Sequence, residues 1–266
     1  MKKSIRYIAI LMLCNLVFIS CTDLDEDEDL YQNENQKTLK NLNIYASKYP
    51  PAFKFDVHID DLKGVFEFLK DNDKKDFEFK KMLVAQFNLK EQFIAKIDRE
   101  IEHVKTGKKG YILVKLNGLE DPAMIDKLYE ASQGGVRIDL IVRGICCLRP
   151  GVPGLSENIR IVRLVDRFLE HARVFSFRND GDDELYLASA DWMTRNLERR
   201  VETGFPITDP DLKAEIRHIL KLQLADNTKA VRLNSEMENI PVREDAKPVR
   251  AQADTYKLVK KGKLGK

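Results

Sequence analysis

The spacing of apolar residues predicts a helix, a strand and a second helix in the first half of the chain. Apolar residues lie three and four positions apart over residues 60–70, which is the spacing of an amphipathic helix. A longer stripe of the same kind covers 89–104 and predicts a second helix. Between them, 79–87 contains a short apolar run that predicts a buried strand.

The middle of the chain alternates between strand and helix patterns. Residues 111–116 and 136–142 are apolar and rich in strand-forming residues, and both runs are short enough for buried strands. The segment 121–133 between them has helical spacing and ends at Gly134-Gly135. Strand–helix–strand order favours a right-handed unit with parallel strands. We therefore predict an α/β fold with a mixed, mainly parallel sheet flanked by helices.

Weaker patterns extend this prediction toward both ends of the chain. Further strands are predicted at 159–163, 173–177 and 185–188, and a last long helix at 209–224. The polar sequence from residue 227 onward predicts a tail that wraps the surface.

The first twenty residues have the layout of a secretion signal. Cations at Lys2, Lys3 and Arg6 precede an apolar run over 7–19, which is too short to span a membrane comfortably. The small residue before Cys21 resembles the lipobox of bacterial lipoproteins, in which that cysteine is acylated. We therefore predict a signal peptide at 1–20 and lipidation at Cys21, and a misassigned start codon or a buried N-terminal helix are the alternatives.

Charge is nearly balanced overall but unevenly placed. The formal net charge is +2, with six acids between Asp23 and Asp29 and a basic tail at 257–266. The acidic stretch fits a solvated linker over 21–54, and the mildly cationic body suits an anionic ligand. Cys146 and Cys147 are adjacent and poorly placed for a disulfide with each other, which favours a reducing compartment. The location therefore has two interpretations, a lipid-anchored protein of the cell envelope or a cytoplasmic one.

Polar and cationic residues follow the predicted strands where those strands end. The carboxyl ends of strands are where α/β proteins gather functional groups. The candidates at or after strand ends with a side chain able to bind phosphate are Lys115, Asn117, Arg143, Arg195, Arg199 and Arg200, and His171 stands just before the strand predicted at 173–177. Guanidinium groups contact phosphate oxygens at two points, lysine adds a point charge, and histidine moves a proton. This set predicts phosphate chemistry.

Two short motifs resemble one half of a phospholipase D site. They are His171-x-Arg173 and, further along, Ser189-x-Asp191-Trp192. The chain departs from that pattern because Arg173 stands in place of lysine and Arg178 in place of aspartate.

Longer strings resemble polyphosphate kinases in order and spacing, over about three quarters of the chain. They run from Tyr111 to Asn117, Met124 to Ser132, Leu140 to Cys147, Arg167 to His171, Ser189 to Asn196 and Lys247 to Gln252. The resemblance implies a phospholipase D-like fold and reversible transfer of the terminal phosphate of ATP to polyphosphate, with magnesium. It assigns nucleotide binding to Arg143 and His171, and makes His171 the candidate catalytic residue. No nucleic-acid partner is expected.

The resemblance covers one half of the family's site. Its phosphohistidine segment lies upstream of residue 55, where the resemblance begins. We therefore predict that 55–106 is a remnant of the preceding catalytic domain and 107–256 a single C-terminal half-site domain. Three hypotheses follow: an enzyme made by a homo-oligomer of half-sites, an inactive protein that binds ATP or polyphosphate at the envelope, and a truncated gene product.

Overall fold

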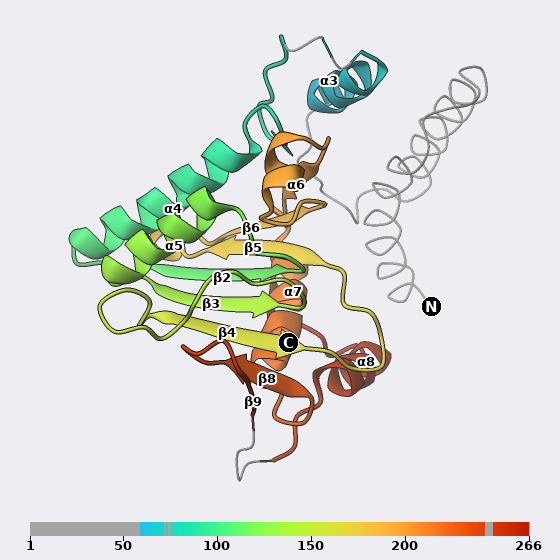
Figure 1. Ribbon diagram of the computed structural model, residues 1–266. Helices are drawn as coiled ribbons and strands as arrows, with labels where there is room; N and C mark the ends of the chain where they lie inside the picture. The colour runs from blue at the N-terminus through green and yellow to red at the C-terminus, as the bar shows by residue number, and fades with distance from the viewer. Residues whose placement is uncertain (1–58, 72, 74–75, 243–246, 266) are drawn as a thin grey trace.

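The computed structural model describes residues 59–71, 73, 76–242 and 247–265 (Figure 1). The predicted signal peptide at 1–20, the lipidation site Cys21 and the linker at 21–54 lie outside these residues.

A single mixed sheet forms the centre of the described structure. Its strands are β1 (Leu83–Val84), β2 (Tyr111–Leu116), β3 (Arg137–Val142), β4 (Ile159–Leu164), β5 (Arg173–Phe177), β6 (Glu184–Ala188), β7 (Thr203–Pro206), β8 (Ala230–Leu233) and β9 (Asn239–Pro241). They are ordered β1-β7-β6-β5-β2-β3-β4-β8-β9. The predicted mixed α/β class is confirmed, but the expectation of a mainly parallel sheet was wrong, because most neighbouring strands pair antiparallel. The parallel pairings within the described residues are β2–β3 and β3–β4, and the strands on either side of this central group pair antiparallel.

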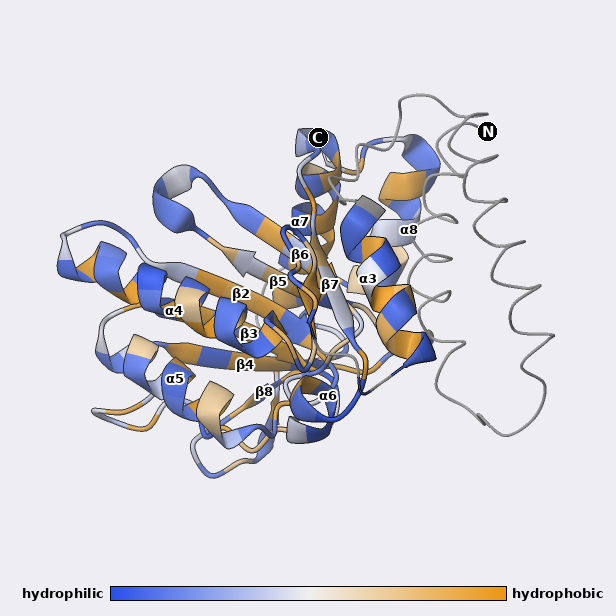
Figure 2. Cartoon of the chain, turned by 90° about the horizontal axis from the view of Figure 1, so that it is seen from above, coloured by the Kyte–Doolittle hydropathy of each residue, from blue (hydrophilic) through white to orange (hydrophobic). Residues whose placement is uncertain are grey.

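Helices cover both faces of this sheet (Figures 1 and 2). They are α3 (Ile59–Lys70), α4 (Leu89–Lys105), α5 (Pro122–Gln133), α6 (Thr194–Glu198), α7 (Pro210–Leu224) and α8 (Ala251–Lys261). In both views α4 and α5 lie over one face and α7 over the other. Pro122 and Pro210 open their helices at the position where a proline costs no hydrogen bond, and an aspartate caps each one.

Alternation along β2 decides which residues reach each face. Ile112 and Val114 enter the main core under α4 and α5, whereas Leu113 enters the core on the α7 side. Lys115 follows by the same alternation and lies on the α7 face. The end of β2 therefore presents a cation on the face where α7 packs.

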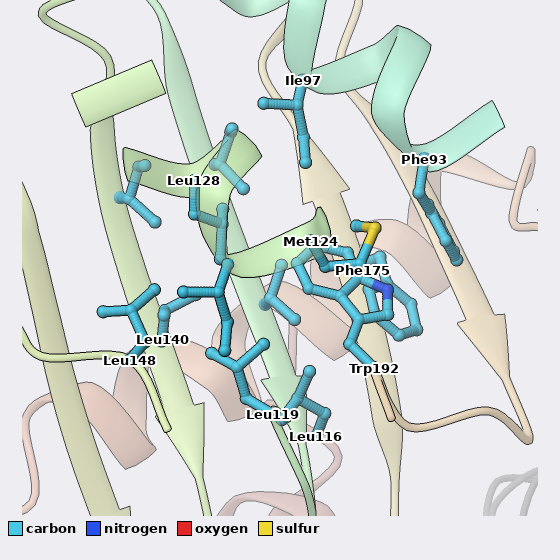
Figure 3. Packing of buried hydrophobic residues seen from close by; sticks show 14 of the residues in the cluster. Phe93, Ile97, Leu116, Leu119, Met124, Leu128, Leu140, Leu148, Phe175 and Trp192 are labelled. Atoms are coloured by element: carbon cyan, nitrogen blue, oxygen red, sulfur yellow. The ribbon is translucent and has the colours of Figure 1, made fainter. Parts of the chain in front are cut away.

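Aromatic packing holds the segment after β6 against the main core. Trp192 is fully buried, and its ring lies stacked on Phe175 at 5.3 Å between centroids (Figure 3). Phe93 from α4 meets the same indole edge-on at 5.7 Å. These contacts fix Asp191, the residue directly before Trp192, at the edge of the sheet.

The prediction for the C-terminal part was wrong. Instead of an irregular polar tail, residues after 227 form β8, β9 and α8, and they extend the sheet beyond β4. Ala230, Leu233 and Ala251 are buried there. Strands of three or four residues show too little alternation to stand out from a polar sequence, because packing rather than pattern stabilises them.

Candidate functional site

The candidate site lies at the edge of the sheet where β2 and β3 end. Lys115 lies near the end of β2, Asn117 directly follows β2, and Arg143 directly follows β3. The connection from β4 returns past α8 to β5 and brings Glu170 and His171 to this edge (Figure 1). Chain segments far apart in sequence therefore meet here, as expected for the carboxyl ends of parallel strands.

Gly144 allows the ends of β2 and β3 to approach closely. Its amide donates to the Asn117 carbonyl at 2.9 Å. A Cβ on Gly144 would lie 2.8 Å from the same oxygen, which is a backbone clash. Any larger residue would therefore push Arg143 away from the end of β2.

Asp191 accepts hydrogen bonds from three residues of the site, Asn117, Gly118 and Arg173. Its Oδ1 accepts from the backbone amides of Asn117 and Gly118 at 2.6 and 3.1 Å. Arg173 donates to both carboxylate oxygens, at 3.3 Å from Nε and 2.9 Å from Nη2. Both side chains are more than nine-tenths buried. The carboxylate is therefore fully engaged by groups that surround the candidate site.

His171 and Arg143 are the predicted site residues that the structure places side by side. Arg143 Nη2 lies 3.4 Å from His171 Nδ1. A guanidinium can only donate, so neutral His171 accepts through Nδ1 and carries its proton on Nε2. The His171 carbonyl accepts from Arg173 Nη1 at 3.2 Å and from Asn117 Nδ2 at 3.5 Å. The backbone of His171 is thus held from two strands.

The surroundings of His171 favour its neutral form. Partial burial and then the cations Arg173 and Arg143 lower its pKa below the ordinary 6.5, and Asp191 opposes them. As pH falls below 6.5, the unfolded chain takes up this proton before the folded one does. The contribution of His171 to stability is therefore fully present above pH 6.5 and is lost as pH falls through the folded pKa.

Lys115 and Glu170 form a nearly buried ion pair below the histidine. Lys115 Nζ lies 3.1 Å from Glu170 Oε2, and its side chain is 5% exposed. Burial lowers the pKa of Lys115, while Glu170 raises it. Gln223 also donates to Glu170 Oε2, at 3.0 Å. Lys115 therefore already has an anionic partner, and its contact with phosphate remains a prediction.

The three arginines after β6 separate into two groups. Arg195 Nη2 lies 3.8 Å from Met193 Sδ, and Met193 packs directly against Gly118 beside Asn117. Arg199 and Arg200 lie at the β1 end of the sheet, where Gln86 Nε2 donates to their carbonyls.

Some residues of the site were not among the sequence candidates. Glu170 and Asp191 stand inside the matching strings and hold the candidates in place, and Gln223 and Gln252 approach from α7 and α8. For Glu170 and Asp191, the available signal in the sequence was an acidic residue in a segment expected to be buried beside predicted cations. For the glutamines the sequence offers none, because the contacts depend on how α7 and α8 pack.

The described residues do not fit a magnesium site held by protein ligands alone. They contain no group of three or more side chains placed to hold a metal ion. The two carboxylates at the site, Glu170 and Asp191, accept from surrounding donors. Asn117 Oδ1 is a buried acceptor with no hydrogen-bond partner in the described part of the chain, but one amide oxygen does not make a magnesium site.

Comparison with known proteins shows which family has this fold and the sequence strings described above. The family model described as Polyphosphate kinase C-terminal domain 2 matches residues 82–252. The chain belongs to this polyphosphate kinase family. The match begins before the predicted domain boundary at residue 107, and α4 packs into the same core as β2.

The similar proteins are longer than this chain. A polyphosphate kinase of Bacillus anthracis is 48% identical over 181 residues, which is 68% of this chain and 26% of that protein. Polyphosphate kinase 1 of Chlorobaculum tepidum is 50% identical over 64% of this chain and 24% of its own length. The crystal structure of polyphosphate kinase from Porphyromonas gingivalis aligns with a TM-score of 0.72 and 50% identity, over 76% of this chain and 31% of that one. The chain thus spans about a quarter to a third of these relatives.

No helix in the part of the chain that the structure describes is both long and apolar enough to cross a membrane.

Proposed function

We propose that this domain supplies the nucleotide-binding half of a polyphosphate kinase site, with Arg143 and His171 holding the phosphates of ATP or ADP. The observation that carries this proposal is their contact at 3.4 Å at the carboxyl edge of the sheet. The guanidinium supplies a two-point contact for phosphate oxygens. Neutral His171, with its proton on Nε2, supplies a hydrogen-bond donor beside it.

The complete reaction is the second part of the proposal. In it, the terminal phosphate of ATP passes reversibly to polyphosphate, and magnesium enters as a complex with the nucleotide phosphates rather than on protein ligands. The nucleophile is a histidine in a segment that the family resemblance places upstream of residue 55. In this chain, two copies that face each other as a homo-oligomer would bring His171 of one copy against His171 of the other. One of these histidines would take the nucleophile's place, accept the terminal phosphate of ATP with release of ADP, and pass it to polyphosphate.

Exposed apolar side chains beside the site support such pairing. Phe168 and Leu169, just before His171, are 65% and 75% exposed, and Ile145 beside Arg143 is 56% exposed. Apolar residues gathered around a binding edge are typical of a surface that another protein covers.

Synthesis of ATP tests the reaction directly. The full chain is incubated with ADP, magnesium and polyphosphate, beside His171→Ala and Arg143→Ala variants. We expect ATP from the wild-type chain alone, at a rate that rises with more than the first power of protein concentration if two copies build the site. A folded chain that binds ADP but forms no ATP would limit the function to binding, and one that binds neither nucleotide would contradict the proposal.

We also propose that Cys21 is lipidated and anchors the chain in the cell envelope. The apolar run over 7–19 and the small residue before Cys21 support it. In a bacterial host fed a labelled fatty acid, we expect label in the wild-type chain and none in a Cys21→Ser variant. An unlabelled wild-type chain in the soluble fraction would favour the cytoplasmic location instead.

A further inference from the structure

The connection that leads into His171 is held by the first turn of α8. Gln252 Oε1 accepts from the Phe168 amide at 2.9 Å, and Gln252 Nε2 donates to the Phe168 carbonyl at 2.8 Å. The same Nε2 lies 3.1 Å from Glu170 Oε1. One side chain therefore holds two residues of the segment that ends at His171.

A second side chain of the same turn holds the start of that segment. Arg250 Nε and Nη2 donate to the two carboxylate oxygens of Asp166 at 2.8 and 2.6 Å. Such a two-point contact fixes direction as well as distance. Arg250 and Gln252 together contact the segment from Asp166 to Glu170 along most of its length.

The turn that makes these contacts is itself anchored. The amide of Ala251 donates to Asp226 Oδ2 at 2.7 Å, and Asp226 is 1% exposed. The other oxygen of Asp226 accepts from the amides of Thr228, Lys229 and Ala230, which follow α7. The start of α8 is thus fixed to the body of the domain.

Burial does little to hold the segment in place. Phe168 and Leu169 are 65% and 75% exposed, so their apolar side chains give it no anchor within the domain. The position of the backbone before His171 then depends on hydrogen bonds, and Gln252 makes three of them. Glu170 meets donors from β2, α7 and α8 at once, in Lys115, Gln223 and Gln252.

We propose that Gln252 is a positioning residue that sets the imidazole of His171 against Arg143 by holding Phe168 and Glu170. Its effect on nucleotide affinity rests on the proposed function, whereas its effect on the position of His171 does not. The role is distinct from nucleotide contact, because Gln252 reaches the site through the segment before His171.

The test compares Gln252→Ala with Gln133→Ala in the full chain. Gln133 also donates from its side chain to a backbone carbonyl, that of Gly154 at 3.0 Å, but lies at the end of α5 away from the site. The readouts are thermal unfolding, the pKa of the His171 ring by NMR titration, and the affinity for ADP. A His171→Gln spectrum assigns the His171 signal.

We expect Gln252→Ala to raise the pKa of His171 toward its ordinary 6.5, because the ring moves away from Arg143 and Arg173. Asp191 stays in place because Arg173 and the amides of Asn117 and Gly118 hold it, whereas Glu170 loses one of its three donors and keeps Lys115 and Gln223. The affinity for ADP should fall roughly tenfold, which is the effect expected when one hydrogen bond to a charged group is lost. Gln133→Ala should change neither quantity.

A second variant separates positioning from packing. Gln252→Glu keeps the size of the side chain and the acceptor for the Phe168 amide, but places a carboxylate against Glu170. Because it can no longer donate to the Phe168 carbonyl and it repels Glu170, the NMR titration should give His171 a different pKa from that in the wild-type chain. Unchanged His171 titration in both Gln252 variants would overturn the proposal. If the wild-type chain binds no ADP, the proposed function fails while the His171 titration still decides the positioning role.

Discussion

Replacement of Asp191 by asparagine is expected to lower the free energy of unfolding by roughly 3 kcal/mol, the scale of breaking a buried ion pair from one side. Arg173 is paired to Asp191 with both side chains more than nine-tenths buried. The new amide would turn a donor toward Arg173 Nη2, which now lies 2.9 Å from a carboxylate oxygen. The guanidinium would stay buried after losing the carboxylate of Asp191.

Urea denaturation at pH 7 measures this effect, with Asp180→Asn as the matched control. Asp180 pairs with Lys108 at 2.7 Å, but the two side chains are 46% and 47% exposed. We expect no resolvable change in the control, because water replaces the lost contact. Equal unfolding midpoints for Asp191→Asn and the wild-type chain would show that the pair does not stabilise the fold.

A double variant separates the ion pair from the backbone contacts of Asp191. In Asp191→Asn, the remaining oxygen still accepts from the amides of Asn117 and Gly118. Adding Arg173→Met removes the buried cation that faced the lost carboxylate, so the combined loss should be smaller than the sum of the single losses by about 1 kcal/mol or more. Strict additivity would mean that the two charges do not interact.

The sequence was sufficient to predict the centre of the fold. Strands β2 and β3 are buried on both faces, so continuous apolar runs mark them clearly, and α5 between them has a capping aspartate and a closing glycine. The pairing of β5 antiparallel to β2 could not be predicted, because register depends on contacts between distant segments. The same limit explains why β8, β9 and α8 were missed.

For the site, strand ends and family strings together brought out Arg143 and His171, which the structure places in contact. Lys115 came from the strand-end argument alone. Its pairing with Glu170, fifty-five positions along the chain, is a tertiary contact that strand position does not reveal. Position at a strand end locates a side chain at the edge of the sheet, but its partner there depends on which loop returns to that edge.

Arg143→Ala should weaken binding of ADP or ATP by roughly tenfold to a hundredfold, which corresponds to losing a charge-assisted hydrogen-bonded contact of about 1.5–3 kcal/mol. The matched control is Arg137→Ala. Arg137 begins β3, at the opposite end of the strand, and its side chain is 69% exposed. Both variants lose one positive charge, so a difference between them reflects position rather than net charge. Isothermal titration calorimetry at two salt concentrations measures both.

One further variant and a pKa measurement on Arg143→Ala show how Arg143 acts. Arg143→Lys keeps the charge and loses the planar fork, so partial recovery of affinity would indicate attraction to a point charge, and no recovery would indicate two-point recognition. In Arg143→Ala, the pKa of His171 should rise, because one of the cations that lower it is gone. At pH 8, well above the ordinary histidine pKa of 6.5, the ring is neutral in both proteins, so the loss of affinity measured there belongs to the guanidinium itself. Equal affinities for Arg143→Ala and Arg137→Ala at that pH would remove Arg143 from the nucleotide site.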